Sequence, residues 1–330
     1  MARVLLLGGS GFIGRHVAER LAREQHMVTI PTRRRERARP DLITLPTVDL
    51  VMADIHDDAA LESLVGRCDV VINLVGILQS RPGTPYGPDF ARAHVELPRR
   101  IAQACGTAGV DRLLHMSALG ASTTGPSEYL RSRGAGEQAI LDAGNTASPP
   151  SGSPPRGRLA VTMFRPSVVF GPGDSFLSLF ARMQRWLPII PLAMAQARFQ
   201  PVFVEDVAEV VVRAMTAPEA IGQTFELAGP EVFTLGELVA FAGAASGHPR
   251  PIIPMPRALA FLQAALMERL PGRLLSRDNL RSMSVDNVSA APWPFGITPT
   301  GLGVVAGAYL GKGYPRSRFE HLRAFAGRPG

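Results

Sequence analysis

Short apolar runs alternate with amphipathic segments through the first half of the chain. Runs that are apolar on both faces are typical of strands in a parallel sheet covered by helices on both sides. The pattern predicts an α/β fold with a Rossmann doubly wound parallel sheet. Strands are expected at 4–7, 27–30, 49–53, 69–75, 112–116 and 160–164, and helices at 12–21, 58–65, 89–108 and 127–143.

The pattern loosens after residue 173, where helical segments predominate. We therefore expect a dinucleotide-binding Rossmann domain over 1–173 and a smaller, mainly helical C-terminal lobe over 174–330 that serves a substrate or partner, with some strands returning to the main sheet. Residues 145–158, rich in proline and serine, predict a surface loop within the first domain. In the lobe, helices are expected at 175–186, 204–216, 235–245, 257–270 and 277–283, and strands at 200–203 and 224–227.

A glycine-rich segment joins the first predicted strand to the first predicted helix. Glycine permits the tight turn, the approach of a pyrophosphate to the backbone, and close packing of helix on sheet. The following helix N-terminus presents free N–H groups and a partial positive charge to the phosphates. Seven residues are accordingly predicted to bind a dinucleotide: Gly8, Gly9, Ser10, Gly11, Phe12, Ile13 and Gly14.

The end of the second strand indicates which dinucleotide is bound. A carboxylate about 20 residues after the glycines would bind the ribose hydroxyls of NAD. Here Arg33 follows Thr32 where a 2′-phosphate would lie, and Arg34 is a second candidate. Because a guanidinium binds phosphate through paired hydrogen bonds, NADP(H) is preferred over NAD(H). The arginines at 35, 37 and 39 are expected in a solvated loop.

Two further strand ends extend the predicted cofactor site. Asp54 and Ile55 follow the third strand, where a carboxylate can accept a hydrogen bond from the adenine amino group. Asp54 serves equally well as a helix cap, and the two interpretations stay open. Leu74, Val75 and Gly76 follow the fourth strand, and Gly76 allows the cofactor to approach closely.

Four motifs, in the expected order, resemble the extended and atypical short-chain dehydrogenase/reductase superfamily. A narrower resemblance is to the NAD(P)H-binding accessory subunit of respiratory complex I and its bacterial relatives; it is carried by 94–98, 115–121, 127–132, 136–137, 277–280 and 286–288. The resemblance places Arg165 and Pro166 at the cofactor edge of the sheet. The four motifs are the glycine segment, Tyr129-Leu130-Arg131-Ser132-Arg133, residues 164–174 and residues 201–208.

The resemblance implies that Tyr129 is the proton-transferring tyrosine. A phenol needs a neighbouring cation to act as a base at neutral pH. The superfamily supplies a lysine four residues later, one helical turn away, where this chain has Arg133. Ser117 takes the first place of the usual serine pair, which leaves Ala118 where the polarising hydroxyl belongs, and His94 replaces an asparagine. Tyr129, Arg133 and Ser117 are the catalytic candidates, and the first two are also expected to contact the cofactor.

Composition excludes several classes of protein. With 46% hydrophobic residues the chain is not a disordered protein, and with two cysteines it is not a disulfide scaffold. Its histidines do not have the spacing of metal ligands, so we expect no metal site. Of 35 basic residues all but Lys312 are arginine. We attribute this arginine excess to a general replacement of lysine by arginine. Despite the net charge of +7 we expect no nucleic-acid partner, because aromatic residues make up only 6%. No apolar run is long enough for a transmembrane segment. We expect a cytoplasmic protein, with a position peripheral to the inner membrane as the alternative.

Two functions stay open from the sequence. Arg133, Ala118 and His94 favour an NADP(H)-binding protein with a structural or redox-sensing role and weak or no turnover. The intact Tyr129 favours an active NAD(P)-dependent oxidoreductase or epimerase acting on an apolar or sugar-linked carbonyl. Residues 256–270, apolar with few charges, predict either a core helix or a surface for a membrane-associated protein, a lipid or an apolar small molecule.

Overall fold

A computed structural model describes residues 1–146, 159–268 and 275–311, which form two compact units. The first unit comprises Met1–Pro166, Val207–Leu227 and Ala291–Ile297. The second comprises Ser167–Asp206, Ala228–Ala290 and the described residues from Thr298 onward. The chain therefore leaves the first unit after the sixth strand and returns to it twice.

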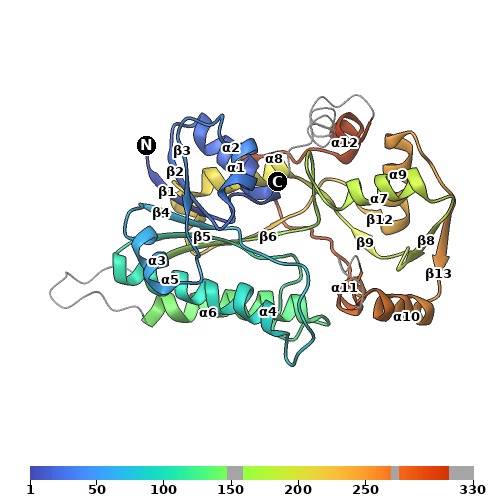
Figure 1. Cartoon of the computed structure of the whole chain (residues 1–330), viewed down its shortest axis with the longest axis horizontal. Coiled ribbons are helices and arrows are strands. Elements are labelled where there is room, and N and C mark those ends of the chain that lie inside the picture. Colours follow the sequence, from blue (N-terminus) through green and yellow to red (C-terminus); the bar gives the residue numbers. More distant parts are fainter. Residues whose placement is uncertain (147–158, 269–274, 312–330) are drawn as a thin grey trace. The chain divides into compact units, whose positions relative to one another are not determined.

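A seven-stranded parallel sheet forms the centre of the first unit (Figure 1). The strands lie in the order β11-β6-β5-β4-β1-β2-β3, so the chain reverses direction across the sheet between β1 and β4. This is the strand order of a dinucleotide-binding Rossmann fold, extended by β11 beside β6. The strands are β1 (Arg3–Leu7), β2 (Met27–Thr32), β3 (Val48–Met52), β4 (Val70–Asn73), β5 (Arg112–Met116), β6 (Ala160–Pro166) and β11 (Thr224–Leu227).

Helices cover both faces of this sheet (Figure 1). On one face, Leu5, Val71 and Leu113 of the strands pack in one core with Leu97 and Ile101 of α5. Continuous apolar strands are explained by this double cover, because each strand buries both of its faces. The helices are α1 (Phe12–Arg23), α2 (Arg35–Leu42), α3 (Asp58–Val65), α4 (Pro88–Phe90), the π-helix η1 (Ala91–Glu96), α5 (Leu97–Ala108), α6 (Glu128–Thr146) and α8 (Val204–Ala214), with short 3-10 turns η2 (Pro218–Ala220) and η3 (Pro294–Gly296).

The described part of the second unit contains three two-stranded sheets and five helices. The pairs are β7 (Val169–Phe170) with β10 (Val202–Phe203), β9 (Arg198–Phe199) with β12 (Phe233–Thr234), and β8 (Ile190–Ala193) with β13 (Ile252–Met255). Its core includes Phe170, Leu177, Ile190 and Leu238. The helices are α7 (Leu177–Trp186), α9 (Leu235–Ser246), α10 (Arg257–Met267), α11 (Arg277–Ser282) and α12 (Leu302–Leu310).

The predicted Rossmann sheet is confirmed, with strand ends displaced by a residue or two. The solvated loop expected at 35–39 is wrong, because residues 35–42 form α2; arginine is a good helix former, and its density hides any apolar period. The single helix expected at 89–108 is interrupted by the π-helix η1. Most of the proline-rich stretch, residues 147–158, lies outside the described residues.

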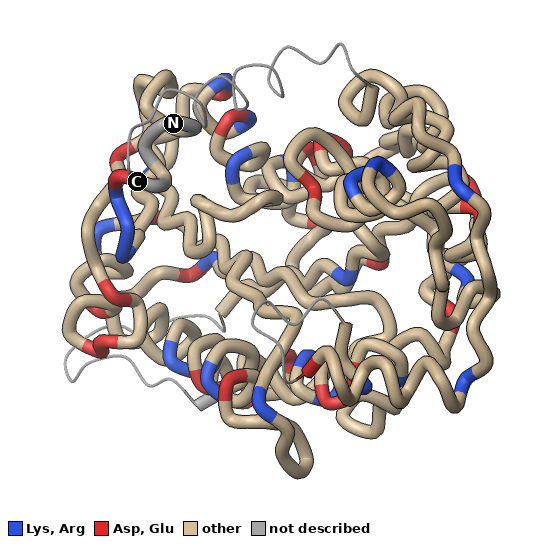
Figure 2. Tube along the Cα trace, turned by 45° about the vertical axis from the view of Figure 1, so that its right-hand side comes forward, with Lys and Arg blue, Asp and Glu red and all other residues tan. Residues whose placement is uncertain are grey.

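Basic and acidic positions are mixed along the described trace (Figure 2). Within the described trace, the arginines therefore alternate with acidic positions and do not line up as a single basic stripe. Cys68 and Cys105 are buried free thiols in the core, and burial raises the pKa of Cys68 to about 11. Across the described residues, none of the helices combines the length and apolarity needed to span a membrane.

Candidate functional site

The glycine-rich segment makes a tight turn between β1 and α1. Gly8 has a φ of +79°, a conformation that favours glycine, and a Cβ there would lie 3.0 Å from the carbonyl carbon of Leu74. A Cβ on Gly14 would lie 2.3 Å from the Gly8 oxygen and 2.6 Å from the Gly9 Cα, so α1 packs directly on the turn. A larger residue at Gly8 would push the turn away from Leu74, and one at Gly14 would push α1 away from the turn.

The N-terminus of α1 is free to receive an anion. Gly11 is the N-cap, and its own N–H donates to the Gly8 oxygen at 2.9 Å. The first turn, starting at Phe12 and Ile13, contains no acidic residue, and Ser10 is exposed. The leading N–H groups of a helix have no intrahelical acceptor, and the helix dipole makes this end positive. These residues therefore fit the pyrophosphate of a dinucleotide.

The end of β2 carries the two arginines predicted to select the cofactor. The N–H of Arg34 donates to Thr32 Oγ1 at 3.2 Å, which turns the chain at the strand end. Arg33 and Arg34 are both exposed. Two flexible guanidinium groups at this edge are available to a phosphate, which is the chemistry expected of a 2′-phosphate site.

Asp54 lies near Arg33 but does not cap a helix. Its Oδ1 accepts the N–H of His56 at 3.0 Å, and this bond lowers the pKa of Asp54, with smaller contributions from Arg33 and Arg92. The cap of α3 is Asp57, which accepts the N–H of Ala60 at 2.9 Å. The cap interpretation of Asp54 is therefore wrong, and its carboxylate stays exposed and charged.

Two residues that the sequence did not suggest extend this charged edge. Arg92 lies on η1, and burial, followed by the charge of Arg92, lowers the pKa of His56. Arg33 acts on the same imidazole, so Arg33 and Arg92 influence one small region. No sequence pattern near Arg92 indicates that it influences His56, because the closeness of the two residues depends on how η1 bends the chain.

The ends of β4 and β5 are joined by a buried pair. Asn73 Nδ2 lies 3.1 Å from His115 Nδ1, and Asn73 Oδ1 accepts the N–H of Val75 at 3.1 Å. The asparagine thus directs the backbone from Leu74 to Gly76 away from the strand. Burial, followed by the charge of Arg133, lowers the pKa of His115 to about 3.

His94 is held by the π-helix and supports the same backbone. Its Nε2 accepts the N–H of Ile77 at 3.0 Å, so the other ring nitrogen carries the proton. That Nδ1–H lies 2.8 Å from Ser132 Oγ, whose hydroxyl donates to the Tyr129 carbonyl at 2.7 Å. Burial, followed by the charge of Arg133, lowers the pKa of His94 to about 2. The imidazole of His94 is therefore neutral. It holds the backbone in place and does not act as a proton carrier.

α6 brings Tyr129 and Arg133 to the edge formed by Val75 and Gly76. Arg133 Nη1 donates to the Met116 oxygen at 3.1 Å and lies 3.5 Å from the Val75 oxygen. The guanidinium also lies 5.3 Å from the centre of the Tyr129 ring. A Cβ on Gly76 would lie 2.1 Å from Arg133 Nη2, so this glycine leaves space for the guanidinium. The predicted tyrosine and cation do come together, but the cation is bound to strand ends.

Ser117 is less suited to polarising a substrate. It is 3% exposed, its N–H donates to the Phe164 oxygen at 2.7 Å, and its Oγ has no hydrogen-bond partner within the described ranges. Ala118, which follows it, is also buried and offers no hydroxyl. The hydroxyl of Ser117, just after β5, is therefore buried.

Arg165 and Pro166 are engaged elsewhere. The Arg165 guanidinium binds both carboxylate oxygens of Glu137 on α6, with Nε 2.8 Å from Oε1, and this bond raises the pKa of Arg165. Pro166 is buried and accepts the N–H of Leu119 at 3.0 Å. This pair joins the end of β6 to α6, one helical turn after Arg133. Ile55 is half-buried and packs against the core of the unit.

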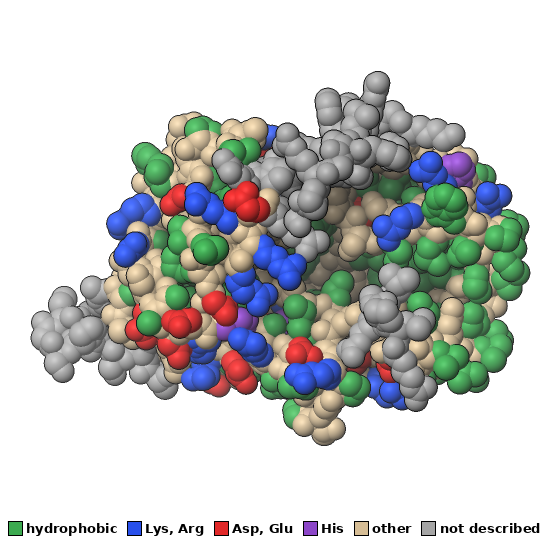
Figure 3. All heavy atoms as spheres, in the orientation of Figure 1, with side chains coloured by type: hydrophobic (Ala, Val, Ile, Leu, Met, Phe, Trp, Pro, Cys, Tyr) green, Lys and Arg blue, Asp and Glu red, His purple; other side chains and the backbone are tan. Residues whose placement is uncertain are grey.

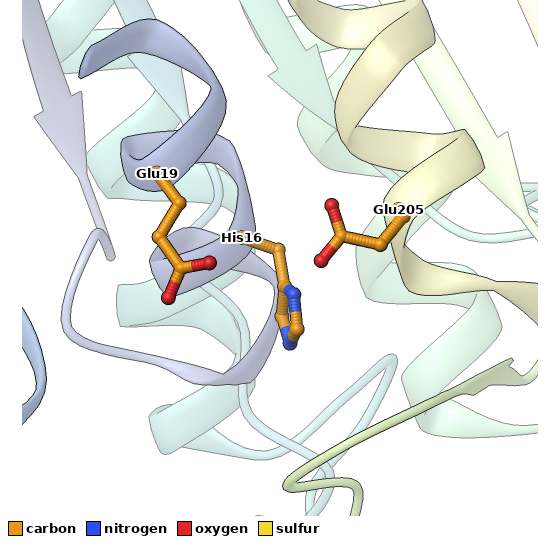
Figure 4. Close-up of side chains that lie close together, drawn as sticks. All are labelled: His16, Glu19 and Glu205. Carbon is orange, nitrogen blue, oxygen red and sulfur yellow. The ribbon is translucent and has the colours of Figure 1, made fainter. Parts of the chain in front are cut away.

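One side-chain pair on α1 bears on metal binding. His16 and Glu19 lie three residues apart on this helix, while Glu205 belongs to the first turn of α8 (Figure 4). His16 is buried, and its ring makes an edge contact with Phe12 at 5.7 Å. Two donors from one helix fall short of the four ligands of a structural zinc site. The expected lack of a metal site stays a prediction.

Comparison with known proteins gives this geometry a context. Residues 4–233 match the NAD dependent epimerase/dehydratase family. The chain is 34% identical over 244 residues to NADH dehydrogenase (ubiquinone) 1 alpha subcomplex subunit 9, mitochondrial, of Mus musculus. That match covers 72% of this chain and 59% of the mouse protein, so the chain spans well under two thirds of that relative.

Two further comparisons are informative. The chain is 30% identical over 216 residues to a ceramide reductase of Caulobacter vibrioides, a match that covers 65% of this chain and 61% of that protein. The fold is similar to UDP-glucose 4-epimerase of Thermus thermophilus in its complex with NAD, with a TM-score of 0.62 and 20% identity over 86% of this chain and 94% of that one. At this identity the structural similarity shows the fold alone.

Proposed function

Because the chain belongs to the NAD-dependent epimerase/dehydratase family and is an NAD(P)-binding protein, we propose that it binds NADP(H) in preference to NAD(H) and has weak or no turnover. Its role is then structural or redox-sensing: the bound dinucleotide stabilises the first unit or reports redox state to a partner. Such a ligand adds several kcal/mol of stability when it saturates its site.

The position of Arg133 is the observation that carries the proposal. In the superfamily that this chain resembles, the cation one turn after the tyrosine assists proton transfer. Here that cation is Arg133, which is only 7% exposed. Its guanidinium donates to the Met116 oxygen and to the Val75 oxygen. A guanidinium that holds two strand ends is not free to follow a developing phenolate, and Ala118 supplies no hydroxyl for a carbonyl. The arrangement supports binding better than catalysis.

The glycine turn supports the cofactor half of the proposal. Gly8, Gly9 and Gly14 let the turn pack tightly against Leu74, Ile30 and α1, and Gly11 places no capping side chain over the start of α1. When bound, a nicotinamide dinucleotide supplies hydride-transfer chemistry. Asn73 and His94 hold the backbone at 75–77 beside the proposed site.

Arg33 is expected to select NADP(H). Replacing it with alanine should lower the affinity for NADPH by about tenfold to a hundredfold, because a charge-assisted bond to phosphate contributes roughly 1.5–3 kcal/mol. The affinity for NADH should hardly change. Fluorescence titration of both cofactors against wild type and Arg33→Ala measures the two affinities. Arg67→Ala, an exposed arginine after α3, is the control, and an unchanged NADPH preference in Arg33→Ala contradicts the assignment.

The proposed partner follows from the mouse relative, which is named as a subunit of NADH dehydrogenase. We extend this to a membrane-associated protein partner, or an apolar small molecule, for the present chain. A cytoplasmic protein at the periphery of the inner membrane is consistent with that partner.

An active NAD(P)-dependent oxidoreductase or epimerase is the second candidate. Tyr129 is in place on α6, and the chain from His94 through Ser132 to the Tyr129 carbonyl orders its backbone. The similarity to a ceramide reductase favours an apolar carbonyl substrate for this alternative. Oxidation of bound NADPH that depends on Tyr129 distinguishes it from the first proposal.

A further inference from the structure

α10, in the second unit, buries two alanines and exposes three leucines. Ala260 and Ala264 are fully buried. Leu259, Leu262 and Leu266 are 55%, 58% and 56% exposed, and their spacing of three and four residues places them on one face. A helix that packs only on its own unit would place leucines inward. Ala260, Ala264 and the partly buried Phe261 pack on the core, so the three leucines lie outside it and are available to a partner.

The strand before α10 and its partner continue the apolar surface. β13 pairs in parallel with β8, with Ile253 opposite Pro191, and Ile190 donates its N–H to the Pro251 oxygen at 2.9 Å. Ile253 and Ile189 are exposed, and Trp186, at the end of α7, is 77% exposed. Figure 3 shows hydrophobic side chains gathered over β8, β13 and α10. We call Trp186, Ile189, Ile253, Leu259, Leu262 and Leu266 the α10 face.

The two segments that form this face lack negative charge. Residues 175–204 and 238–267 contain no aspartate or glutamate. They do contain Arg182, Arg185 and Arg257, all exposed, and Arg250, whose Nε donates to the Gln184 oxygen at 3.0 Å next to Trp186. The surface is thus apolar with a border of arginines. The nearest acidic residue along α10 is its C-cap, Glu268, which is paired with Arg277.

We propose that the α10 face docks the protein on a membrane surface that contains anionic lipid. Leucine and isoleucine would enter the boundary between headgroups and acyl chains, and Trp186 would lie at the headgroup level, where indole rings are favoured. The arginines would meet lipid phosphates. This inference does not depend on the bound cofactor or on turnover.

Charge distinguishes a membrane from a second copy of the chain as the occupant. A twofold dimer through this face would bring one arginine-bordered surface against another, and the carboxylate that ends α10, Glu268, is already paired with Arg277. Like charges brought together in this way oppose association. An anionic lipid surface supplies the opposite charge over the whole border.

Binding of the full chain to vesicles tests the proposal. Vesicles of equal parts phosphatidylcholine and phosphatidylglycerol should sediment with the protein, and pure phosphatidylcholine vesicles should bind it less well. Leu262→Glu and Leu266→Glu should each lower the affinity by about tenfold or more, since burying a leucine contributes roughly 1.5–3 kcal/mol. Arg182→Gln and Arg185→Gln should each lower the affinity for phosphatidylglycerol vesicles by about fivefold and reduce the salt dependence of binding.

Ile43→Glu is the matched control, because Ile43 is 58% exposed, like Leu262, but lies in the first unit. It should bind vesicles as wild type does, and all variants should melt at the wild-type temperature. Failure of wild type to bind phosphatidylglycerol vesicles at low salt overturns the proposal. So does a concentration-dependent dimer in sedimentation velocity that Leu262→Glu dissociates while vesicle binding is unchanged, which would assign the face to a protein contact.

Discussion

Replacing Arg133 with methionine should lower the free energy of unfolding by about 3 kcal/mol, because two bonds from a charged donor to backbone carbonyls are lost and methionine cannot replace them. The guanidinium joins the Met116 oxygen on β5 to the Val75 oxygen after β4. Arg133→Lys should recover only part of the loss, since one compact ammonium cannot reproduce the planar fork. Urea unfolding of wild type and both variants gives the free energies.

The control for this prediction is Arg99→Met, an exposed arginine on α5 whose Nη1 donates to Gln103 Oε1 at 3.1 Å. It should change stability by no more than about 0.5 kcal/mol. If Arg133→Met is as stable as Arg99→Met, the guanidinium does not hold the strand ends, and the explanation for weak turnover fails with it.

Stability should fall steeply as the pH drops below about 6.5. In the folded protein, burial lowers the pKa of His94 to about 2 and that of His115 to about 3, from the ordinary value of 6.5. Below about pH 6.5 the unfolded chain binds protons that the folded chain refuses, so the stability present at neutral pH is lost as the pH falls towards the folded values. Between pH 7 and pH 5 the loss should be about 2 kcal/mol for each histidine and about 4 kcal/mol together.

Urea unfolding at pH 7 and pH 5 measures this loss. The double variant His94→Asn with His115→Asn should lose about 4 kcal/mol less than wild type over the same interval, whatever its stability at pH 7. His56, whose pKa is lowered chiefly by burial, acts in the same direction and is unchanged in both proteins. His248→Asn, on a half-buried loop after α9, is the control. Equal pH dependence in wild type and the double variant would contradict the neutral buried state of the pair.

The sheet and the glycine turn were predictable because both depend on local sequence. A strand buried on both faces must be apolar throughout, and a turn that needs φ of +79° favours glycine whatever surrounds it. β8 and β13 were not predicted, because each is four residues long and contains a proline, which reads as a turn.

The function of Arg133 was not predictable, since its acceptors follow two different strands and are backbone carbonyls that no side-chain pattern reveals. The π-helix around His94 was hidden for a similar reason: one extra residue in a helical turn leaves the apolar spacing nearly intact. The leucine face of α10 also reverses the ordinary expectation, because a run of leucines and alanines does not say which of the two faces inward.

Single-turnover kinetics on NADPH-loaded protein tests most directly whether this chain binds its cofactor without using it. Wild type and Tyr129→Phe, each with its NADPH affinity measured, are mixed with a panel of aldehydes, ketones and quinones, and oxidation of the bound cofactor is followed by absorbance. We predict that NADPH is oxidised no faster in wild type than in Tyr129→Phe. Oxidation in wild type that Tyr129→Phe abolishes, with its cofactor still bound, would contradict the account and establish an active reductase.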